Sequence, residues 1–256
     1  MSKTILITGA TSGFGEAMAH VFAAAGNKLI ITGRKESLLL ALKETLVAKH
    51  NTSVHTLCFD VQNKEAVFAA IKTIPDNFSC IDVLINNAGF GINKAFSVSN
   101  LDSEQQLLDV LVRTPMRLMH TVLPQMEERN TGSIINVSSV AGWIAGGTYS
   151  AAKSYLTVLS ESIHTEMSGT GVKISALCPG FTRTEFHERG RMRMNGLPEF
   201  MWLSSDRVVT QAWKENQNGK VLSVPGWQYL ILSTIARTAP RPMVRKLGMN
   251  VRRKQR

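Results

Sequence analysis

Tyr149 and Lys153 are the residues of this chain whose types and spacing best fit acid–base chemistry. They lie four positions apart, so on a helix both side chains project from the same face. An ammonium group beside a phenol favours the phenolate. We therefore expect Lys153 to lower the pKa of Tyr149 from its usual value of about 10 towards the range useful for proton transfer. The other two tyrosines, Tyr155 and Tyr229, have no lysine at this spacing.

The same pair also occurs on solvent-exposed helices, so its meaning depends on its neighbours. Ser139 ends an apolar segment, residues 132–139, that is typical of a buried strand. Its hydroxyl can hydrogen-bond a substrate oxygen. Ser139, Tyr149 and Lys153 therefore form a candidate set for proton transfer to a carbonyl oxygen, provided that a redox cofactor binds nearby.

A glycine-rich turn near the N-terminus lies between a short apolar segment and a segment rich in helix-forming residues. Strand, turn and helix in this order bring backbone N–H groups and the positive end of a helix to one point, which suits a pyrophosphate. Gly9 fits the turn, Gly13 the close approach of a phosphate, and Gly15 the packing of helix on strand. The spacing, Gly-x-x-x-Gly-x-Gly, differs from the commonest dinucleotide fingerprint. We expect cofactor contacts from Gly9, Thr11, Ser12, Gly13, Phe14 and Gly15.

The second apolar segment, residues 28–32, ends in Gly33 and Arg34. In dinucleotide-binding folds an acidic residue at this place binds the ribose 2′-hydroxyl, whereas an arginine accommodates a 2′-phosphate. Arg34 therefore favours NADP(H) over NAD(H). The alternative is that Arg34 and Lys35 only begin a surface helix.

Apolar strand-like segments alternate along the chain with helical ones, which is typical of βαβ units and a parallel sheet. We expect strands at residues 4–7, 28–32, 53–61, 82–85, 132–139, 173–177 and 220–224. We expect helices at residues 16–25, 36–49, 64–72, 102–129, 149–167 and 206–217. Pro115 should kink or break the fourth helix, and Pro124 marks its last turns. The predicted fold is α/β, a single domain with a three-layer, doubly wound, Rossmann-type parallel sheet.

These motifs, taken together and in order, resemble the short-chain dehydrogenase/reductase family. The resemblance runs from Thr4 to about Thr184 and includes residues 86–89 and Pro179-Gly180. It implies an enzyme that transfers a hydride between NADP(H) and a carbonyl or secondary alcohol. It also implies that Tyr149 is the general acid or base, that Lys153 holds the nicotinamide ribose, and that Ser139, rather than Ser138, polarises the substrate oxygen. Further cofactor contacts implied by the resemblance are Asp60, Val61, Asn87, Ala88, Gly89, Pro179, Gly180 and Thr184.

The chain departs from the family's pattern at two places. Leu111 stands where the family usually has an asparagine that anchors a water molecule linking the lysine to solvent, and leucine cannot hydrogen-bond. An NADP(H)-binding sensor or scaffold with little turnover is therefore an alternative function. The spacing of ten residues from Ser139 to Tyr149, against about thirteen in the family, shortens the loop of residues 143–148 and reshapes one wall of the substrate pocket.

The predicted catalytic domain spans residues 1–225, with a substrate lid at about residues 181–203. The lid is rich in arginine and large apolar residues. This composition suggests a substrate with an apolar body, although solvated arginines above packed apolar residues explain it equally well. Residues 226–256 form an extension that is apolar and then basic. Such a segment could lie on a membrane surface, but packing on the core or on a second copy is the more usual outcome, and we expect a homodimer or homotetramer.

The net charge of +10 comes mostly from this extension, because eight of its residues are Lys or Arg and none is Asp or Glu. A solvated tail therefore explains the charge better than nucleic-acid binding. No apolar segment approaches the length of a membrane span, and the histidines lack metal-ligand spacing, so we expect a cytoplasmic protein without a metal site. Cys58, Cys80 and Cys178 lie in apolar segments and are expected to be buried free thiols. A methyltransferase would also use a glycine turn, but it has no role for Tyr149 and Lys153.

Overall fold

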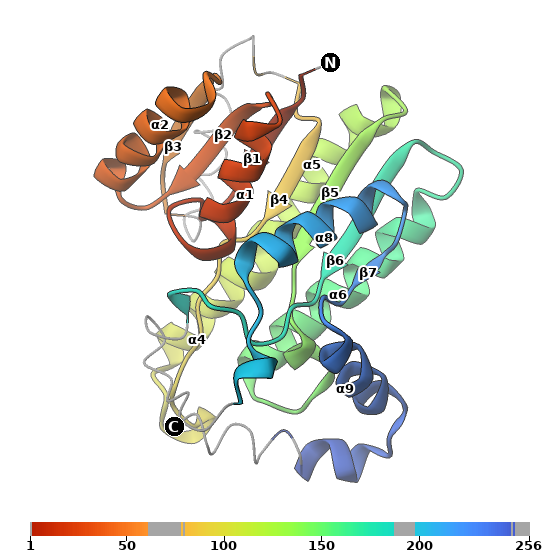
Figure 1. The fold of residues 1–256 in the computed structure, drawn as a ribbon. Helices are drawn as coiled ribbons and strands as arrows, with labels where there is room; N and C mark the ends of the chain where they lie inside the picture. The colour runs from red at the N-terminus through yellow and green to blue at the C-terminus, as the bar shows by residue number, and fades with distance from the viewer. Residues whose placement is uncertain (1, 61–77, 79, 187–197, 247, 249–256) are drawn as a thin grey trace.

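The computed structural model describes residues 2–60, 78, 80–186, 198–246 and 248. Within them a seven-stranded sheet has the order β3-β2-β1-β4-β5-β6-β7, and every neighbouring pair of strands is parallel (Figure 1). The strands are β1 (Thr4–Ile7), β2 (Lys28–Gly33), β3 (Val54–Cys58), β4 (Val83–Asn86), β5 (Gly132–Val137), β6 (Val172–Leu177) and β7 (Leu222–Ser223). The predicted α/β fold with a doubly wound parallel sheet is confirmed.

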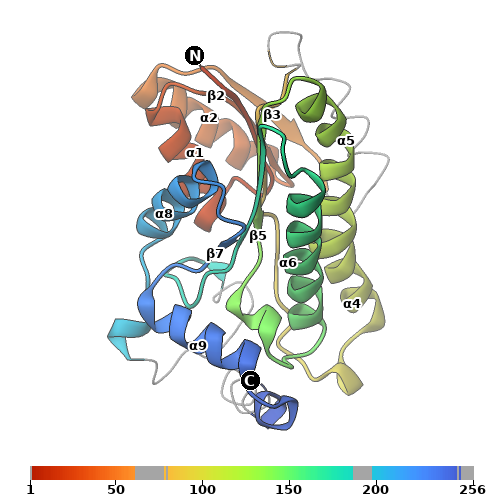
Figure 2. The ribbon, with the colours of Figure 1, turned by 90° about the vertical axis from the view of Figure 1, so that its right-hand side faces the viewer.

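Helices cover both faces of the sheet, which gives three layers (Figure 2). One face packs against α1 (Gly13–Ala24), α2 (Glu36–His50) and α8 (Ser205–Gln217). The other face packs against α4 (Leu101–Leu108), α5 (Thr114–Glu128) and α6 (Thr148–Glu166). Burial on both faces explains why the strands are continuous apolar segments rather than alternating ones.

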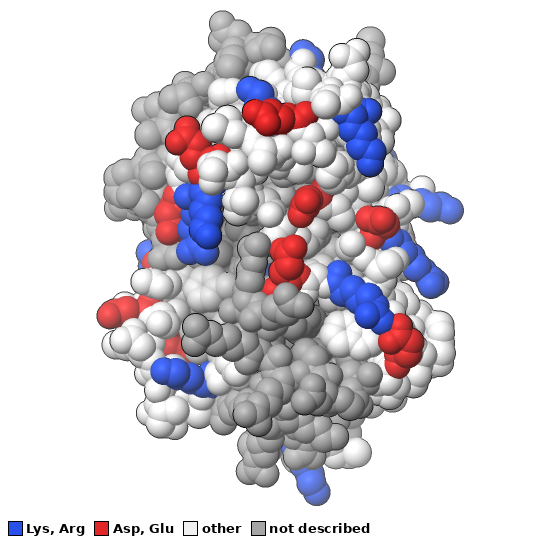
Figure 3. Space-filling view, turned by 60° about the vertical axis from the view of Figure 1, so that its left-hand side comes forward, with Lys and Arg blue, Asp and Glu red and all other residues white. Residues whose placement is uncertain are grey.

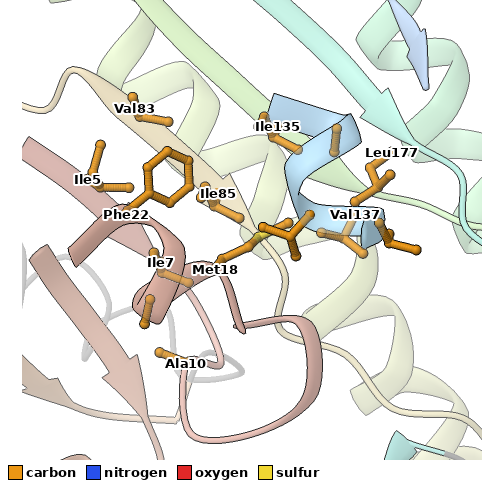
Figure 4. Close-up of a cluster of buried hydrophobic side chains, with 14 of the residues drawn as sticks. Ile5, Ile7, Ala10, Met18, Phe22, Val83, Ile85, Ile135, Val137 and Leu177 are labelled. Carbon is orange, nitrogen blue, oxygen red and sulfur yellow. The ribbon is translucent and has the colours of Figure 1, made fainter. Parts of the chain in front are cut away.

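Successive residues of a strand point to opposite faces, and this alternation divides the core in two. Ile5 and Ile7 of β1 lie in the same cluster as Met18 and Phe22 of α1 (Figure 4). Leu6, between them, belongs to the cluster on the opposite face. The register of β1 is therefore fixed from both sides, because a shift by one residue would exchange the two sets.

The strand order places the candidate site at the carboxyl end of the sheet. β1 pairs with β2 on one side and with β4 on the other. Strands β2 and β3 therefore extend the sheet to one side of β1, and strands β4 to β7 extend it to the other. Ligands of open α/β sheets bind at such a switch point, beyond the carboxyl ends of the strands. The glycine turn follows β1 at this place, and Asn87 follows β4.

The predicted helix of residues 102–129 is divided at the place where Pro115 stands. α4 ends at Leu108, a π-helical turn spans Asp109–Arg113, and α5 begins at Thr114. Proline has no N–H to donate to the carbonyl four residues earlier, so the regular helix is interrupted one turn before it. Leu111 lies inside the π-turn and is buried.

Several smaller expectations differ from the structure. Of the three cysteines, Cys58 and Cys80 are exposed and Cys178 is buried. Cys58 lies between the buried Leu57 and Phe59, and the alternation along an extended chain turns its side chain away from the core. Strand β3 ends at Cys58 and not at Val61, β5 ends at Val137 and not at Ser139, and β7 comprises two residues only. The expected helix at residues 64–72 lies outside the described residues. None of the helices in the described part of the chain is long and apolar enough to cross a membrane.

Candidate active site

The glycine turn has the geometry of a cradle for an anion. Gly9 and Gly13 have φ values of +64° and +57°, which L side chains rarely adopt. A Cβ on Gly15 would lie 2.3 Å from the carbonyl oxygen of Gly9, so Gly15 lets the first turn of α1 pack on the turn itself. The N-cap residue, Ser12, makes no side-chain hydrogen bond to the helix, which leaves the first N–H groups of α1 to other partners.

Hydrogen bonds join the glycine turn to the end of β4. The Thr8 hydroxyl oxygen accepts hydrogen bonds from the backbone N–H groups of Asn87 (2.9 Å) and Ala88 (3.1 Å). The side-chain amide of Asn87 donates in turn to the carbonyl oxygens of Thr8 and Gly9, both at 3.0 Å. Asn87 therefore braces the glycine turn, and the predicted contact residues after β1 and β4 come together.

The end of β2 reaches the same cradle. A Cβ on Gly33 would lie 3.1 Å from the Thr11 methyl group, and the backbone N–H of Ala10 donates to the Thr32 carbonyl oxygen. Arg34 follows directly, is exposed, and makes no ion pair with another described residue. Asp60 lies partly buried beyond β3, whereas Val61 is outside the described residues. The structure thus places a free cation beside the turn.

Lys153 lies beneath the site and is only 4% exposed. Its ammonium donates a hydrogen bond of 2.5 Å to the carbonyl oxygen of Val137, the last residue of β5. Burial lowers the pKa of Lys153 to about 8, because the charged form loses hydration. The ammonium lies 5.7 Å from the ring centroid of Tyr149, so the two residues share one face of α6 as predicted.

The expected effect on Tyr149 is wrong in direction. Desolvation raises the pKa of Tyr149 to about 12, and a side-chain hydrogen bond with Ser139 lowers it by less. The physical reason is that the loss of water around the phenolate outweighs the interaction with Ser139, whereas Lys153 makes no resolved contribution to this pKa. Tyr149 is therefore protonated at neutral pH.

The side chains of the two serines after β5 make different contacts. The Ser138 hydroxyl is buried and bonds the Lys153 carbonyl oxygen (2.8 Å) and the Thr157 hydroxyl (2.7 Å), which fastens α6 to the sheet. Ser139 is the N-cap of a short 3-10 helix, η4 (Val140–Trp143), and accepts a hydrogen bond from the Ala141 N–H. Ser139, and not Ser138, thus has its hydroxyl beside Tyr149.

Leu111 lies near Lys153, as the resemblance to the family implies for this position. Its Cδ2 lies 3.0 Å, and the Lys153 Nζ 4.0 Å, from the point where a Cβ of Gly89 would stand. Gly89 follows Asn87 and Ala88, so this segment leads from the glycine turn to the neighbourhood of Lys153. A methyl group of Leu111, in the π-helical turn, therefore lies in the neighbourhood of the Lys153 ammonium.

The segment after β6 is held by a residue that sequence reasoning passed over, Tyr229 of α9 (Trp227–Thr238). A Cβ on Gly180 would lie 2.1 Å from the Tyr229 ring, so this glycine makes room for the ring. The Tyr229 hydroxyl accepts from the Phe181 N–H at 2.9 Å and donates to the Met201 carbonyl oxygen at 2.5 Å. No motif flags Tyr229, because its task depends on two segments that meet only in the fold.

The described ends of the expected lid lie near the site. The ring of Phe186 has its centroid 5.8 Å from that of Tyr149. Arg183 forms an exposed ion pair with Glu199. Thr184 lies against Gly13, and both line a cavity of about 280 Å³ between α1 and the start of α8. The other lid arginines, at positions 189, 191 and 193, lie outside the described residues.

Pro179 contributes through its backbone, since its carbonyl oxygen accepts a hydrogen bond from the N–H of Val140. Two further residues near Lys153 carried no sequence signal, namely Thr157 and the buried Cys178. Their side chains lie 3.9 Å apart, and burial raises the pKa of the Cys178 thiol to about 12. The thiol is therefore protonated and belongs to the packing around the lysine. No group of three or more metal-ligating side chains occurs among the described residues.

Comparison with known proteins agrees with this geometry. A family model described as short chain dehydrogenase matches residues 3–194. Serine 3-dehydrogenase of Rhizobium radiobacter is 38% identical over 190 residues, which cover 73% of this chain and 74% of that protein. A short-chain dehydrogenase from Sphingobium yanoikuyae, solved in complex with NADPH, has a TM-score of 0.81 at 28% identity and covers 91% of this chain and 92% of its own. A family member from Burkholderia phymatum, solved with NAD, has a TM-score of 0.81 at 25% identity, again covering 91% and 92% of the two chains. The chain therefore belongs to the short-chain dehydrogenase family.

Proposed function

We propose that this protein is an NADP(H)-dependent oxidoreductase that interconverts a carbonyl compound and a secondary alcohol. The observation that carries the proposal is the joint position of three side chains at the carboxyl end of the sheet. The ammonium of Lys153 lies 5.7 Å from the Tyr149 ring centroid, and the Ser139 side chain is close enough to Tyr149 to lower its pKa. The same edge carries the glycine turn, joined to this set through residues 87–89.

Tyr149 would act as the proton donor in the direction of reduction. Its pKa of about 12 keeps the phenol protonated at neutral pH, and a general acid must hold its proton before the reaction. Ser139 would hydrogen-bond the substrate oxygen, and Lys153 would place a positive charge where that oxygen gains electron density. Bound NADP(H) would supply the hydride.

The residues at the proposed cofactor site fit NADP(H). The start of α1, which has no side-chain cap hydrogen bond, suits a pyrophosphate. Arg34 is exposed and suits a 2′-phosphate, which an arginine fork binds better than a hydroxyl. One relative with this fold was solved with NADPH and another with NAD, so the fold alone does not select the cofactor. The proposed preference for NADP(H) therefore depends on Arg34. The proposed contacts are Gly9, Thr11, Ser12, Gly13, Phe14, Gly15, Arg34, Asp60, Val61, Asn87, Ala88, Gly89, Tyr149, Lys153, Pro179, Gly180 and Thr184.

Turnover of the purified full-length protein tests the catalytic proposal. We expect NADPH to be consumed with at least one member of a panel of ketones and aldehydes. Tyr149→Phe should lower kcat by about 10²- to 10⁴-fold while NADPH still binds, because only the proton donor is lost. Tyr155→Phe is the matched control, since Tyr155 is on the same helix and 39% exposed. A Tyr149→Phe variant with unchanged activity would contradict the assigned role.

Binding of the two cofactors tests the preference. Arg34→Ser should weaken NADPH binding by roughly 10- to 100-fold, the value of one or two charge-assisted hydrogen bonds, and leave NADH binding unchanged. Lys35→Ser, one residue further on, should have little effect. Equal losses of NADPH and NADH affinity in Arg34→Ser would show that the arginine does not read the 2′-phosphate.

A second candidate function follows from Leu111. With a methyl group in place of a polar side chain beside Lys153, the protein would bind NADP(H) but turn over slowly or not at all, as a sensor or scaffold. NADPH binding without consumption across the whole carbonyl panel would favour this function. Turnover that depends on Tyr149 would exclude it.

A further inference from the structure

Helix α9 is fastened to the protein by one face only. Gln228, Tyr229, Ser233 and Ala236 are buried. Gln228 donates to the Phe200 carbonyl oxygen at 3.0 Å, and Tyr229 is wedged against Gly180. These contacts fix the rotation of the helix about its axis, so the opposite face is held outward.

That outward face is apolar. Trp227, Leu230, Ile231 and Ile235 are 68%, 52%, 51% and 51% exposed. They recur at intervals of three and four residues and so form one stripe along the helix. Met243, in the helical residues 241–246 that follow, is 65% exposed. The expectation that this segment packs on the core is therefore met by one face of α9 and not by the other.

The charged residues that follow the stripe have one sign. Exposed Arg237, Arg241, Arg245 and Lys246 follow it closely. Eight of the 29 Lys and Arg residues of the chain lie after Gly226, whereas none of the 19 Asp and Glu residues does. Elsewhere the two signs are mixed, as on the face shown in Figure 3, where acidic and basic side chains alternate. Glu199, next to the Phe200 that contacts Gln228 of α9, is already in an ion pair with Arg183. An apolar stripe followed by basic residues is complementary to a surface with apolar depth and anionic groups.

We propose that this face of α9, with the basic residues that follow it, binds the surface of an anionic lipid bilayer. Packing against α9 of a second copy fits less well, because the basic residues of the two helices would then face each other. The helix is also too short to span a membrane, so it would lie in the interface, with Trp227 at the level of the headgroups.

The docking face adjoins the catalytic end of the molecule. Figures 1 and 2 show α9 at the end to which the carboxyl ends of the strands point. The Arg237 guanidinium lies 5.7 Å from the Trp143 ring centroid, and a Cβ on Gly248 would lie 2.9 Å from the Ala145 backbone. Both contacts are with the short loop that precedes Tyr149. Docking would thus bring this loop towards the bilayer. The proposal concerns binding and does not depend on the proposed activity.

Vesicle sedimentation with the full-length protein tests the proposal. We expect binding to vesicles of phosphatidylcholine with phosphatidylglycerol, little binding to pure phosphatidylcholine, and weakening by salt. The double variant Ile231→Ser/Ile235→Ser should reduce binding by about tenfold or more. The matched control Leu40→Ser/Val47→Ser removes two exposed apolar residues from α2 and should bind like the original protein. Tryptophan emission should shift to the blue with anionic vesicles, and Trp227→Phe should abolish most of that shift.

Three results would overturn the proposal. The first is no binding to anionic vesicles at low salt. The second is unchanged binding by Ile231→Ser/Ile235→Ser, which would leave only non-specific attraction by the basic tail. The third is a stable dimer, measured by light scattering, that the same double variant dissociates, because the face would then belong to a second copy.

Discussion

Leu111 and Lys153 approach the same point above Gly89, one with a methyl group and the other with an ammonium. Leu111 Cδ2 is 3.0 Å and Lys153 Nζ 4.0 Å from the place where a Cβ of Gly89 would stand. A buried ammonium that gives or receives protons during turnover needs a polar route to solvent, and Leu111 blocks one direction of approach.

Leu111→Asn should raise kcat for carbonyl reduction several-fold, because the amide can hold a water molecule beside the ammonium. The exchange introduces a polar group at a site that is 1% exposed, so we expect a loss of stability of about 2–4 kcal/mol. Leu111→Met keeps the site apolar and is the control for altered packing. If kcat and the solvent isotope effect stay unchanged in a folded Leu111→Asn protein, protons leave by another route.

Lys153→Met should abolish activity and stabilise the fold. Burial of the ammonium lowers its pKa from 10.5 to about 8, so the folded protein binds fewer protons than the unfolded chain between these values. Burial of the charged lysine therefore lowers the free energy of unfolding by its full amount below pH 8, and this loss declines as the pH rises to about 10.5. Urea unfolding at pH 7 should show a gain of roughly 1–3 kcal/mol that shrinks at pH 10. Lys214→Met, on the exposed side of α8, is the control and should change neither activity nor stability. A loss of stability in Lys153→Met would mean that the hydrogen bond to the Val137 carbonyl oxygen contributes more than the desolvation of the ammonium costs.

The rate of carbonyl reduction should depend on pH through Lys153. Tyr149, with a pKa of about 12, keeps its proton throughout the neutral range, whereas the ammonium of Lys153 loses its proton near pH 8. We therefore expect kcat/KM to be level below pH 7 and to fall as the pH passes through about 8. The measurement is a pH profile between about pH 6 and 10 at saturating NADPH. A rate that rises steadily to pH 10 would show that the phenolate, and not the phenol, is the active form.

Tyr229→Phe should loosen the segment that follows β6. The hydroxyl accepts from the Phe181 N–H and donates to the Met201 carbonyl oxygen, so its removal leaves two backbone groups without this partner. We expect a loss of about 1–3 kcal/mol in stability and a higher KM for the carbonyl substrate. Chemical denaturation and steady-state kinetics measure the two effects. Because the ring that fills the space beside Gly180 is retained, an unchanged KM would mean that packing alone positions this segment.

Much of the fold was predictable because its signals are local. Short apolar segments at residues 4–7 and 28–32, each followed by a glycine turn or a helical segment, favoured buried strands, and glycine at positions 9 and 13 permits the positive φ that the turn adopts. The ends of strands were harder to predict. The polar Ser138 and Ser139 follow β5 directly, and in the structure they leave the sheet to bond α6 and to begin η4. Which of two neighbouring residues leaves a strand is decided by the helix that packs on it.

The sequence by itself determined the α/β fold, the glycine turn after β1 and the pair Tyr149 and Lys153 on one helix face, because each depends on local patterns of residue types. The departure at Leu111 was visible only through the resemblance to the family. The tertiary structure alone decided the pKa values, since desolvation depends on all the atoms around a group and raised the pKa of Tyr149 where the neighbouring charge alone predicted the opposite. It likewise decided that Tyr229 holds the segment after β6 and that one face of α9 is left exposed, because both follow from contacts between residues far apart in the chain.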